Sequence, residues 1–300
     1  MVNKSKLIVV LLVTLSTLFA AVMGSCVKHV STDLNTFIIC FYRCLFGLLI
    51  ILPFISKDNF KILKSKNIKL QFFRSMINII SMICWFSALS MMQFEKATAL
   101  GFTTPLFTTI LAVIMLNEVI RFHRTAALFI GLIGILVIIR PGYIPLEYGT
   151  LLMLIASLTF SFVQIFVKRL SSIDSNLTII FYHLAFMTPV FFIISIFYWE
   201  TISFNQIIIF FIMGLSGLLS HWCMNQSLKM SDTTFVMPLQ FTKLIWASLV
   251  GLLLFSEIPD YWTWIGGIII FISVVYITYR EQFIKKDSTE IKQIDRAIIN

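Results

Sequence analysis

Long apolar runs, separated by short polar segments, recur along almost the whole chain. Ten runs are found, at residues 7–27, 34–55, 72–92, 97–116, 125–139, 149–167, 176–198, 207–228, 233–255 and 261–279. None shows the period-two alternation of a half-buried strand, and about 20 apolar residues are enough for a helix to cross a bilayer. A helix also satisfies its own backbone hydrogen bonds in lipid. The pattern predicts an all-α integral membrane protein with ten transmembrane helices.

Composition supports this class. Hydrophobic residues make up 59% of the chain and charged residues 12%, with a mean hydropathy of +0.95, whereas a soluble domain carries about 25% charged residues. The net charge of +9 comes from basic residues in short loops. This distribution indicates a lipid bilayer as the surroundings and argues against a nucleic-acid partner. The first run also has features of a signal peptide, but we expect it to remain as an uncleaved first helix.

Two short signatures recur at a fixed separation. Lys28 lies 140 positions before Lys168, and Tyr42 lies 140 positions before Tyr182. The first pair stands in Val-Lys-His-Val-Ser and Val-Lys-Arg-Leu-Ser, and the second in Phe-Tyr-Arg and Phe-Tyr-His. A chain of 300 residues that repeats in this way is built from two copies of one unit. We expect the repeats at residues 1–143 and 144–280, followed by a cytoplasmic tail at 281–300.

The distribution of Lys and Arg predicts the orientation. With the N-terminus in the cytoplasm, eighteen of these residues, Arg74 included, fall on the inner side and three on the outer side. The remaining two, Arg43 and Lys243, lie within apolar runs. This bias places both termini in the cytoplasm. Because each repeat has five runs, the second repeat enters the membrane in the opposite orientation, which is typical of secondary transporters.

The ends of the fourth helices suggest a family. Leu116-Asn117-Glu118 closes the fourth run and Phe255-Ser256-Glu257 closes the ninth, and a glycine-containing run follows each. Pro105 and Pro238 lie inside these runs at unequal distances from the glutamates. Two five-helix units of this kind resemble the ten-helix EamA branch of the drug/metabolite transporter superfamily.

The resemblance implies a secondary transporter of a small metabolite, multi-pass in the bacterial inner membrane. Within this branch the chain is similar to S-adenosylmethionine uptake carriers, so the resemblance implies S-adenosylmethionine uptake, which exchange with S-adenosylhomocysteine could drive. The alternative is export of an amino acid, drug or other metabolite. No nucleophile with its base and no HExxH motif is present. We therefore expect no enzymatic activity, metal or cofactor; the oligomeric state is left open.

Four ionisable residues fall in mid-membrane, where charge is costly and usually functional: Arg43, His183, His221 and Lys243. No Asp or Glu lies in the middle of any run to pair with Arg43. A substrate carboxylate or phosphate is therefore the expected partner of Arg43, and helix carbonyls or Glu118 are the alternative. Lys243 is a candidate second anion contact, with snorkelling as its alternative. The lack of a central acid favours exchange or facilitated uptake of an anion-bearing molecule over cation–proton antiport.

Neighbouring polar and aromatic residues complete the candidate substrate site. Trp85 can stack a planar base or cover a cation, and Pro105, next to Thr104, frees a backbone carbonyl. Tyr42-Arg43 and Tyr182-His183 are expected to approach each other near the midplane. Packing inside the bundle is the alternative for Trp85 and the two tyrosines, and an interhelical hydrogen bond is the alternative for His221. The full predicted set is Tyr42, Arg43, Asn78, Trp85, Thr104, Gln164, Tyr182, His183, His221, Asn225, Gln240 and Lys243.

Overall fold

The computed structural model describes residues 4–57, 63–92, 94–101, 103–118, 122–139, 148–255, 261–262, 264–269, 271–273 and 276. The elements within these ranges are all helical: α1 (Lys4–Val30), α2 (Thr36–Lys57), α3 (Ile68–Met91), α4 (Phe94–Gly101), α5 (Thr103–Leu116), α6 (Phe122–Ile139), α7 (Tyr148–Leu170), α8 (Asn176–Ser195), the 3-10 turn η2 (Ile196–Tyr198), α9 (Phe204–Met230), α10 (Thr233–Leu239) and α11 (Thr242–Phe255). The all-α prediction is confirmed for the described residues, which contain no strand.

Seven stretches of the described residues are long and apolar enough to cross a membrane. The fourth, fifth and tenth predicted runs correspond to shorter apolar helices, at Thr103–Leu116, Thr125–Gly134 and Trp264–Ser273. The predicted tail at 281–300 lies outside the described residues.

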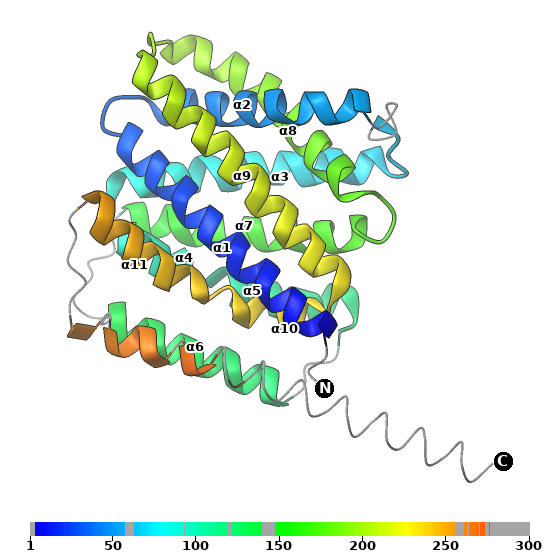
Figure 1. Cartoon of the computed structure of the whole chain (residues 1–300), viewed down its shortest axis with the longest axis vertical. Coiled ribbons are helices and arrows are strands. Elements are labelled where there is room, and N and C mark those ends of the chain that lie inside the picture. The colour runs from blue at the N-terminus through cyan, green and yellow to red at the C-terminus, as the bar shows by residue number, and fades with distance from the viewer. Residues whose placement is uncertain are drawn as a thin grey trace, which may run out of the picture.

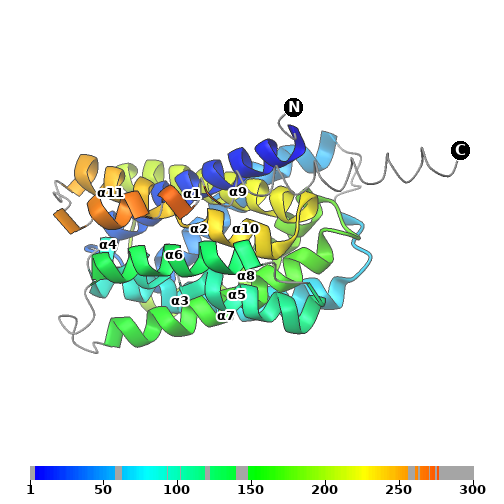
Figure 2. The same cartoon turned by 90° about the horizontal axis from the view of Figure 1, so that it is seen from below.

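The helices form two layers. Figure 2 shows α1, α9 and α11 in one layer and α3, α5 and α7 in the other, and in Figure 1 α2 and α8 lie at one edge of the bundle and α6 at the other. The pairings follow the sequence duplication. α1 packs against α9 as α7 packs against α3, and α11 contacts α1 as α5 contacts α7. When each helix is replaced by its counterpart in the other repeat, the first pairing becomes the second. Every one of these pairs joins a helix of one repeat to a helix of the other, so the core lies between the repeats.

The ninth run is divided into two helices, because α10 ends at Leu239 and α11 begins at Thr242. At this break the Gln240 and Phe241 N–H groups donate to carbonyls only three residues back, two and three residues after Pro238. In the fourth run, α4 and α5 flank residue 102, which lies outside the described residues.

The repeated lysines tie helix ends together. Lys28 Nζ donates to the Leu89 and Met92 carbonyls at 3.0 and 2.7 Å, at the end of α3. Lys168 Nζ donates to the Leu228 and Ser231 carbonyls, at 2.6 Å each, at the end of α9. The last carbonyls of a helix have no partner within it, and a cation there also compensates the helix dipole. The Val-Lys signature thus has the same structural role in both repeats.

We expect Lys28→Met and Lys168→Met each to lower the stability of the protein by about 1–3 kcal/mol, because each leaves two helix-end carbonyls without a donor. The sites are separate, so the double variant should show the sum of the two effects. Thermal unfolding of the detergent-solubilised protein measures this. Lys229→Met, at an exposed lysine near the end of α9, is the control. A midpoint equal to that of the control would contradict the proposed role of these lysines.

Candidate functional site

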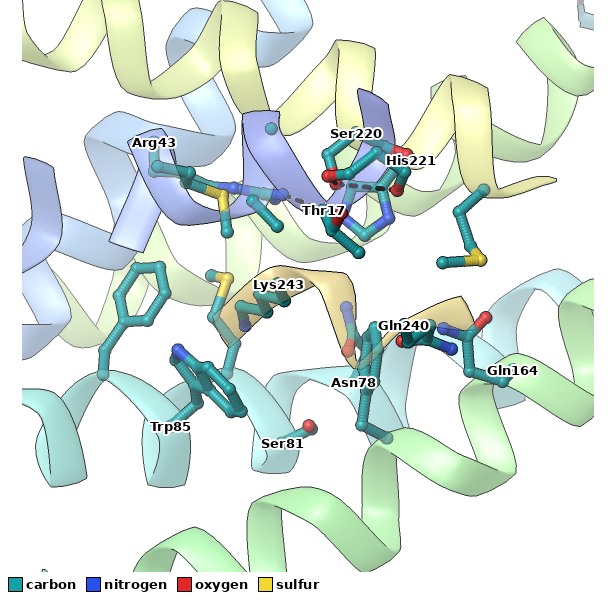
Figure 3. Close-up of a pocket in the computed structure, with 18 residues that line it drawn as sticks. Thr17, Arg43, Asn78, Ser81, Trp85, Gln164, Ser220, His221, Gln240 and Lys243 are labelled. Carbon is teal, nitrogen blue, oxygen red and sulfur yellow. Dashed lines mark hydrogen bonds between the residues drawn. The ribbon is translucent and has the colours of Figure 1, made fainter. Parts of the chain in front are cut away.

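A cavity lies between the two layers, near the break between α10 and α11. Its volume is about 130 Å³, below the roughly 300–1,000 Å³ typical of small-molecule sites, so a larger ligand requires side chains of the wall to move. Its wall combines side chains from α1, α2, α3, α7, α9 and the α10–α11 segment (Figure 3). Seven of the twelve predicted substrate residues line it, namely Arg43, Asn78, Trp85, Gln164, His221, Gln240 and Lys243.

Arg43 reaches the cavity from α2. Its side chain is 3% exposed, and its Nη2 lies 3.0 Å from His221 Nε2 on α9. A guanidinium can only donate, so His221 Nε2 accepts and this imidazole is neutral in the observed arrangement. The space for the guanidinium comes from Gly217, where an added Cβ would lie 3.1 Å from Arg43 Nη2. α2 and α9 therefore hold a charged donor at the cavity wall.

Lys243 and Trp85 are in contact with each other at the cavity wall. The ammonium lies 4.1 Å from the centre of the Trp85 ring (Figure 3), a cation–π contact. The ring is also held from α4, because an added Cβ on Gly101 would lie 2.7 Å from it. Trp85 thus lies between Gly101 on α4 and Lys243 at the start of α11.

The two imidazoles form a polar layer between α3, α8 and α9. The His183 ring centre lies 5.0 Å from that of His221, and Asn78 Nδ2 lies 3.4 Å from His183 Nε2. His183 is fully buried behind the wall and does not line the cavity. The predicted approach of Arg43 and His183 therefore takes place through His221, which stands between them.

The remaining predicted residues lie away from the cavity wall. Tyr42 stacks on Phe210, with ring centres 5.0 Å apart, and the Tyr182 hydroxyl donates to the Leu63 carbonyl at 2.7 Å. Both tyrosines follow the packing alternative. The Thr104 carbonyl accepts from Ser161 Oγ at 3.1 Å. Asn225 is 2% exposed, and its Nδ2 has no partner among the described residues.

Hydroxyl groups of α1 are part of the wall that the sequence prediction missed. Ser16 Oγ donates to the Ser220 carbonyl at 2.8 Å, and Ser220 Oγ donates to the Ser16 carbonyl at 2.9 Å. Thr17 Oγ1 lies 2.9 Å from Thr242 Oγ1. The signal was present in the first run, since Ser16, Thr17, Ala20 and Gly24 form a small-residue face at helical spacing.

Two charged residues depart from their expected positions. Arg74, counted among the inner loop cations, lies within α3 and is fully buried. Glu118, the alternative partner of Arg43, accepts instead from the Thr233 and Thr234 N–H groups at 3.0 and 2.9 Å. It therefore stabilises the first turn of α10 and leaves Arg43 without a carboxylate.

The charge balance limits what the cavity can hold. Its wall carries Arg43 and Lys243, and none of the residues described along it is Asp or Glu. Amides of Asn78, Gln164 and Gln240 provide neutral donors and acceptors. Within the described part of the chain, no group of three His, Cys, Asp or Glu side chains is arranged to bind a metal. The arrangement suits an organic molecule with an anionic group and a flat ring.

Comparisons with known proteins agree with this architecture. The chain is 28% identical over 255 residues to the S-adenosylmethionine uptake transporter of Rickettsia felis, covering 85% of this chain and 87% of the relative. It is 28% identical over 238 residues to the riboflavin transporter of Vibrio cholerae, covering 78% and 80%. The pseudopaline exporter CntI of Pseudomonas aeruginosa is 22% identical, covering 90% and 95%.

A solved crystal structure shares the fold, with a TM-score of 0.74 at 14% sequence identity, covering 93% of this chain and 98% of that one. The family model described as the EamA-like transporter family matches twice, at residues 7–140 and 147–279. The chain therefore belongs to the EamA-like transporter family and is a multi-pass transporter of the inner membrane, not an enzyme.

Proposed function

We propose that the protein takes up S-adenosylmethionine through the inner membrane, in exchange for S-adenosylhomocysteine. The observation that carries this proposal is the cavity wall, where two cations and an aromatic ring meet without a carboxylate. The similarity to the S-adenosylmethionine uptake transporter of Rickettsia felis supports the same substrate. The riboflavin transporter relative supports a ligand with a flat heteroaromatic ring.

We further propose ten transmembrane helices in two inverted repeats, at residues 1–143 and 144–280, with both termini and the tail at 281–300 in the cytoplasm. The excess of Lys and Arg on one side supports this orientation. Exchange of the two repeats converts each helix pairing into its counterpart, as alternating access at a site between inverted repeats requires.

The proposed binding mode follows the chemistry of the wall. The substrate carboxylate lies at Arg43, whose planar fork matches two carboxylate oxygens. The adenine ring stacks on Trp85. The amide oxygens of Gln164 and Gln240, which are neutral acceptors, hold the substrate's ammonium and sulfonium groups away from Arg43 and Lys243. Binding thus requires Lys243 to leave the face of Trp85 that it covers.

Proteoliposomes containing the purified protein test the proposal. We expect labelled S-adenosylmethionine to enter vesicles loaded with S-adenosylhomocysteine about tenfold or more faster than empty vesicles, because an exchanger returns across the membrane with substrate bound. Protein-free vesicles are the control. Equal rates in loaded and empty vesicles would exclude exchange. Labelled riboflavin and pseudopaline, assayed for entry and exit, test the alternatives: transport of either one without entry of S-adenosylmethionine would overturn the substrate assignment.

A further inference from the structure

A fully buried guanidinium lies beyond the cavity wall. Arg74 on α3 is 0% exposed, and its Nη1 donates to the Ile179 carbonyl on α8 at 3.0 Å. Its Nε and Nη2 have no hydrogen-bond partner among the described residues. A guanidinium remains protonated in proteins, and buried donors without a partner are rare because they lose their hydration without compensation. These two N–H groups are therefore available to a ligand.

The polar face that lines the cavity on α3 continues to Arg74. Asn78, on the cavity wall, lies four residues after Arg74, and Gln71 lies three residues before it. Residues three or four apart share a helix face. α8 packs against this face of α3, and it places the Ile179 carbonyl against Arg74 and the His183 ring against Asn78. The α3–α8 seam is thus a polar track that starts at the cavity.

The far end of the seam is closed by a carboxylate. Asp174, 6% exposed, accepts from Gln71 Nε2 at 2.9 Å, Ser65 Oγ at 2.6 Å and the Lys66 N–H at 2.9 Å. These bonds join the segment before α3 to the segment before α8, at the proposed inner side. They occupy Asp174, so the described hydrogen bonds of Arg74 include no carboxylate.

The matching seam of the other repeat is built differently. The positions 139 and 140 residues after Arg74 are Met213 and Gly214 on α9. An added Cβ on Gly214 would lie 2.8 Å from the Gly47 backbone nitrogen, so α2 and α9 are in direct contact there. The α2–α9 seam is thus closely packed, whereas the α3–α8 seam contains the buried Arg74, which has two unused donors.

We propose that Arg74 is a second anion-binding residue, to which the carboxylate of the substrate passes from Arg43 when the α3–α8 seam opens. The inference deepens the proposed transport function and rests on it. The unused Nε and Nη2 groups can donate to both oxygens of one carboxylate. His221 contacts Arg43, and His183, one helical turn after Ile179, contacts His221 and Asn78, so the anion moves along a track of polar side chains. Asp174 keeps the inner end closed in the observed arrangement.

Transport kinetics test this step. Arg74→Gln retains a donor for the Ile179 carbonyl but removes the charge. We expect it to bind S-adenosylmethionine with the wild-type Kd within about threefold, because Arg43 still holds the carboxylate, and to lower the maximal rate about tenfold or more. Arg74→Lys should recover part of that rate. Lys229→Gln, which removes an exposed cation near the end of α9, is the control. An unchanged maximal rate in Arg74→Gln would overturn the proposal.

A second measurement separates this inference from the choice of substrate. Thermal unfolding of the purified protein is compared in sodium acetate, sodium chloride and sodium gluconate at equal ionic strength. We expect acetate to raise the midpoint of Arg43→Gln over gluconate, because Arg74 remains as a carboxylate site, but not that of the double variant Arg43→Gln/Arg74→Gln. Such a result would support the anion site even if S-adenosylmethionine is not transported. An equal rise in the double variant, no rise in Arg43→Gln, or a rise with chloride alone would overturn a carboxylate site at Arg74.

Discussion

Replacement of Arg43 by alanine is expected to abolish uptake while the protein still folds and inserts. Arg43 is 3% exposed, its guanidinium donates to His221 Nε2, and none of the described residues that line the same cavity carries a carboxylate. Loss of a buried charged partner costs about 2–5 kcal/mol, and each 1.4 kcal/mol is a factor of about ten. Uptake should therefore fall about 30-fold or more. Initial rates in proteoliposomes, at equal protein content, measure the effect.

Two further variants separate charge from position at this site. Arg43→Lys keeps the charge but loses the planar fork, so we expect it to recover only part of the rate. Gly217→Val keeps Arg43 but introduces a side chain where an added Cβ already lies 3.1 Å from Nη2, so we expect the guanidinium to be displaced and uptake to fall. Wild-type uptake by Arg43→Ala, with the protein correctly inserted, would show that Arg43 does not contact the substrate.

An ionisable residue inside an apolar run proved a good predictor of the cavity wall, whereas the residues next to it in sequence did not. Arg43, His221 and Lys243 were selected as ionisable residues inside apolar runs, and all three line the wall. Tyr42 and Tyr182 were added because they precede Arg43 and His183 in sequence. Successive residues of a helix point about 100° apart, so a tyrosine beside a cavity residue faces a different neighbour. Tyr42 accordingly stacks on Phe210.

Hydropathy also could not locate the break between α10 and α11 or the true depth of Arg74. The ninth run spans this break as one apolar run, and Pro238 inside it is the residue that indicates an interruption. Arg74 lies close to the start of its apolar run, where a cation is usually assigned to the membrane surface. Its burial results from packing against α8, which periodicity within α3 does not reveal.

Removal of the Trp85 ring is expected to have the second large effect. In the observed arrangement Lys243 covers the ring at 4.1 Å, and Gly101 on α4 lies close to the same ring. Stacking of a base on an aromatic side chain contributes about 1–3 kcal/mol. The KM of Trp85→Ala for S-adenosylmethionine should therefore rise about 5- to 150-fold, whereas Trp85→Phe, which keeps an aromatic face, should retain part of the affinity.

The contact between Lys243 and Trp85 makes their effects interdependent. Lys243→Met removes the ammonium that covers the ring as well as a candidate contact for the substrate anion. Residues in contact are expected to couple by about 0.5–3 kcal/mol, so the loss caused by Lys243→Met should differ by about twofold or more when Trp85 is already alanine. A double-mutant cycle on kcat/KM for uptake measures this coupling. Strictly additive effects would show that substrate binding does not require Lys243 to move off the ring, and that the two residues act on the substrate separately.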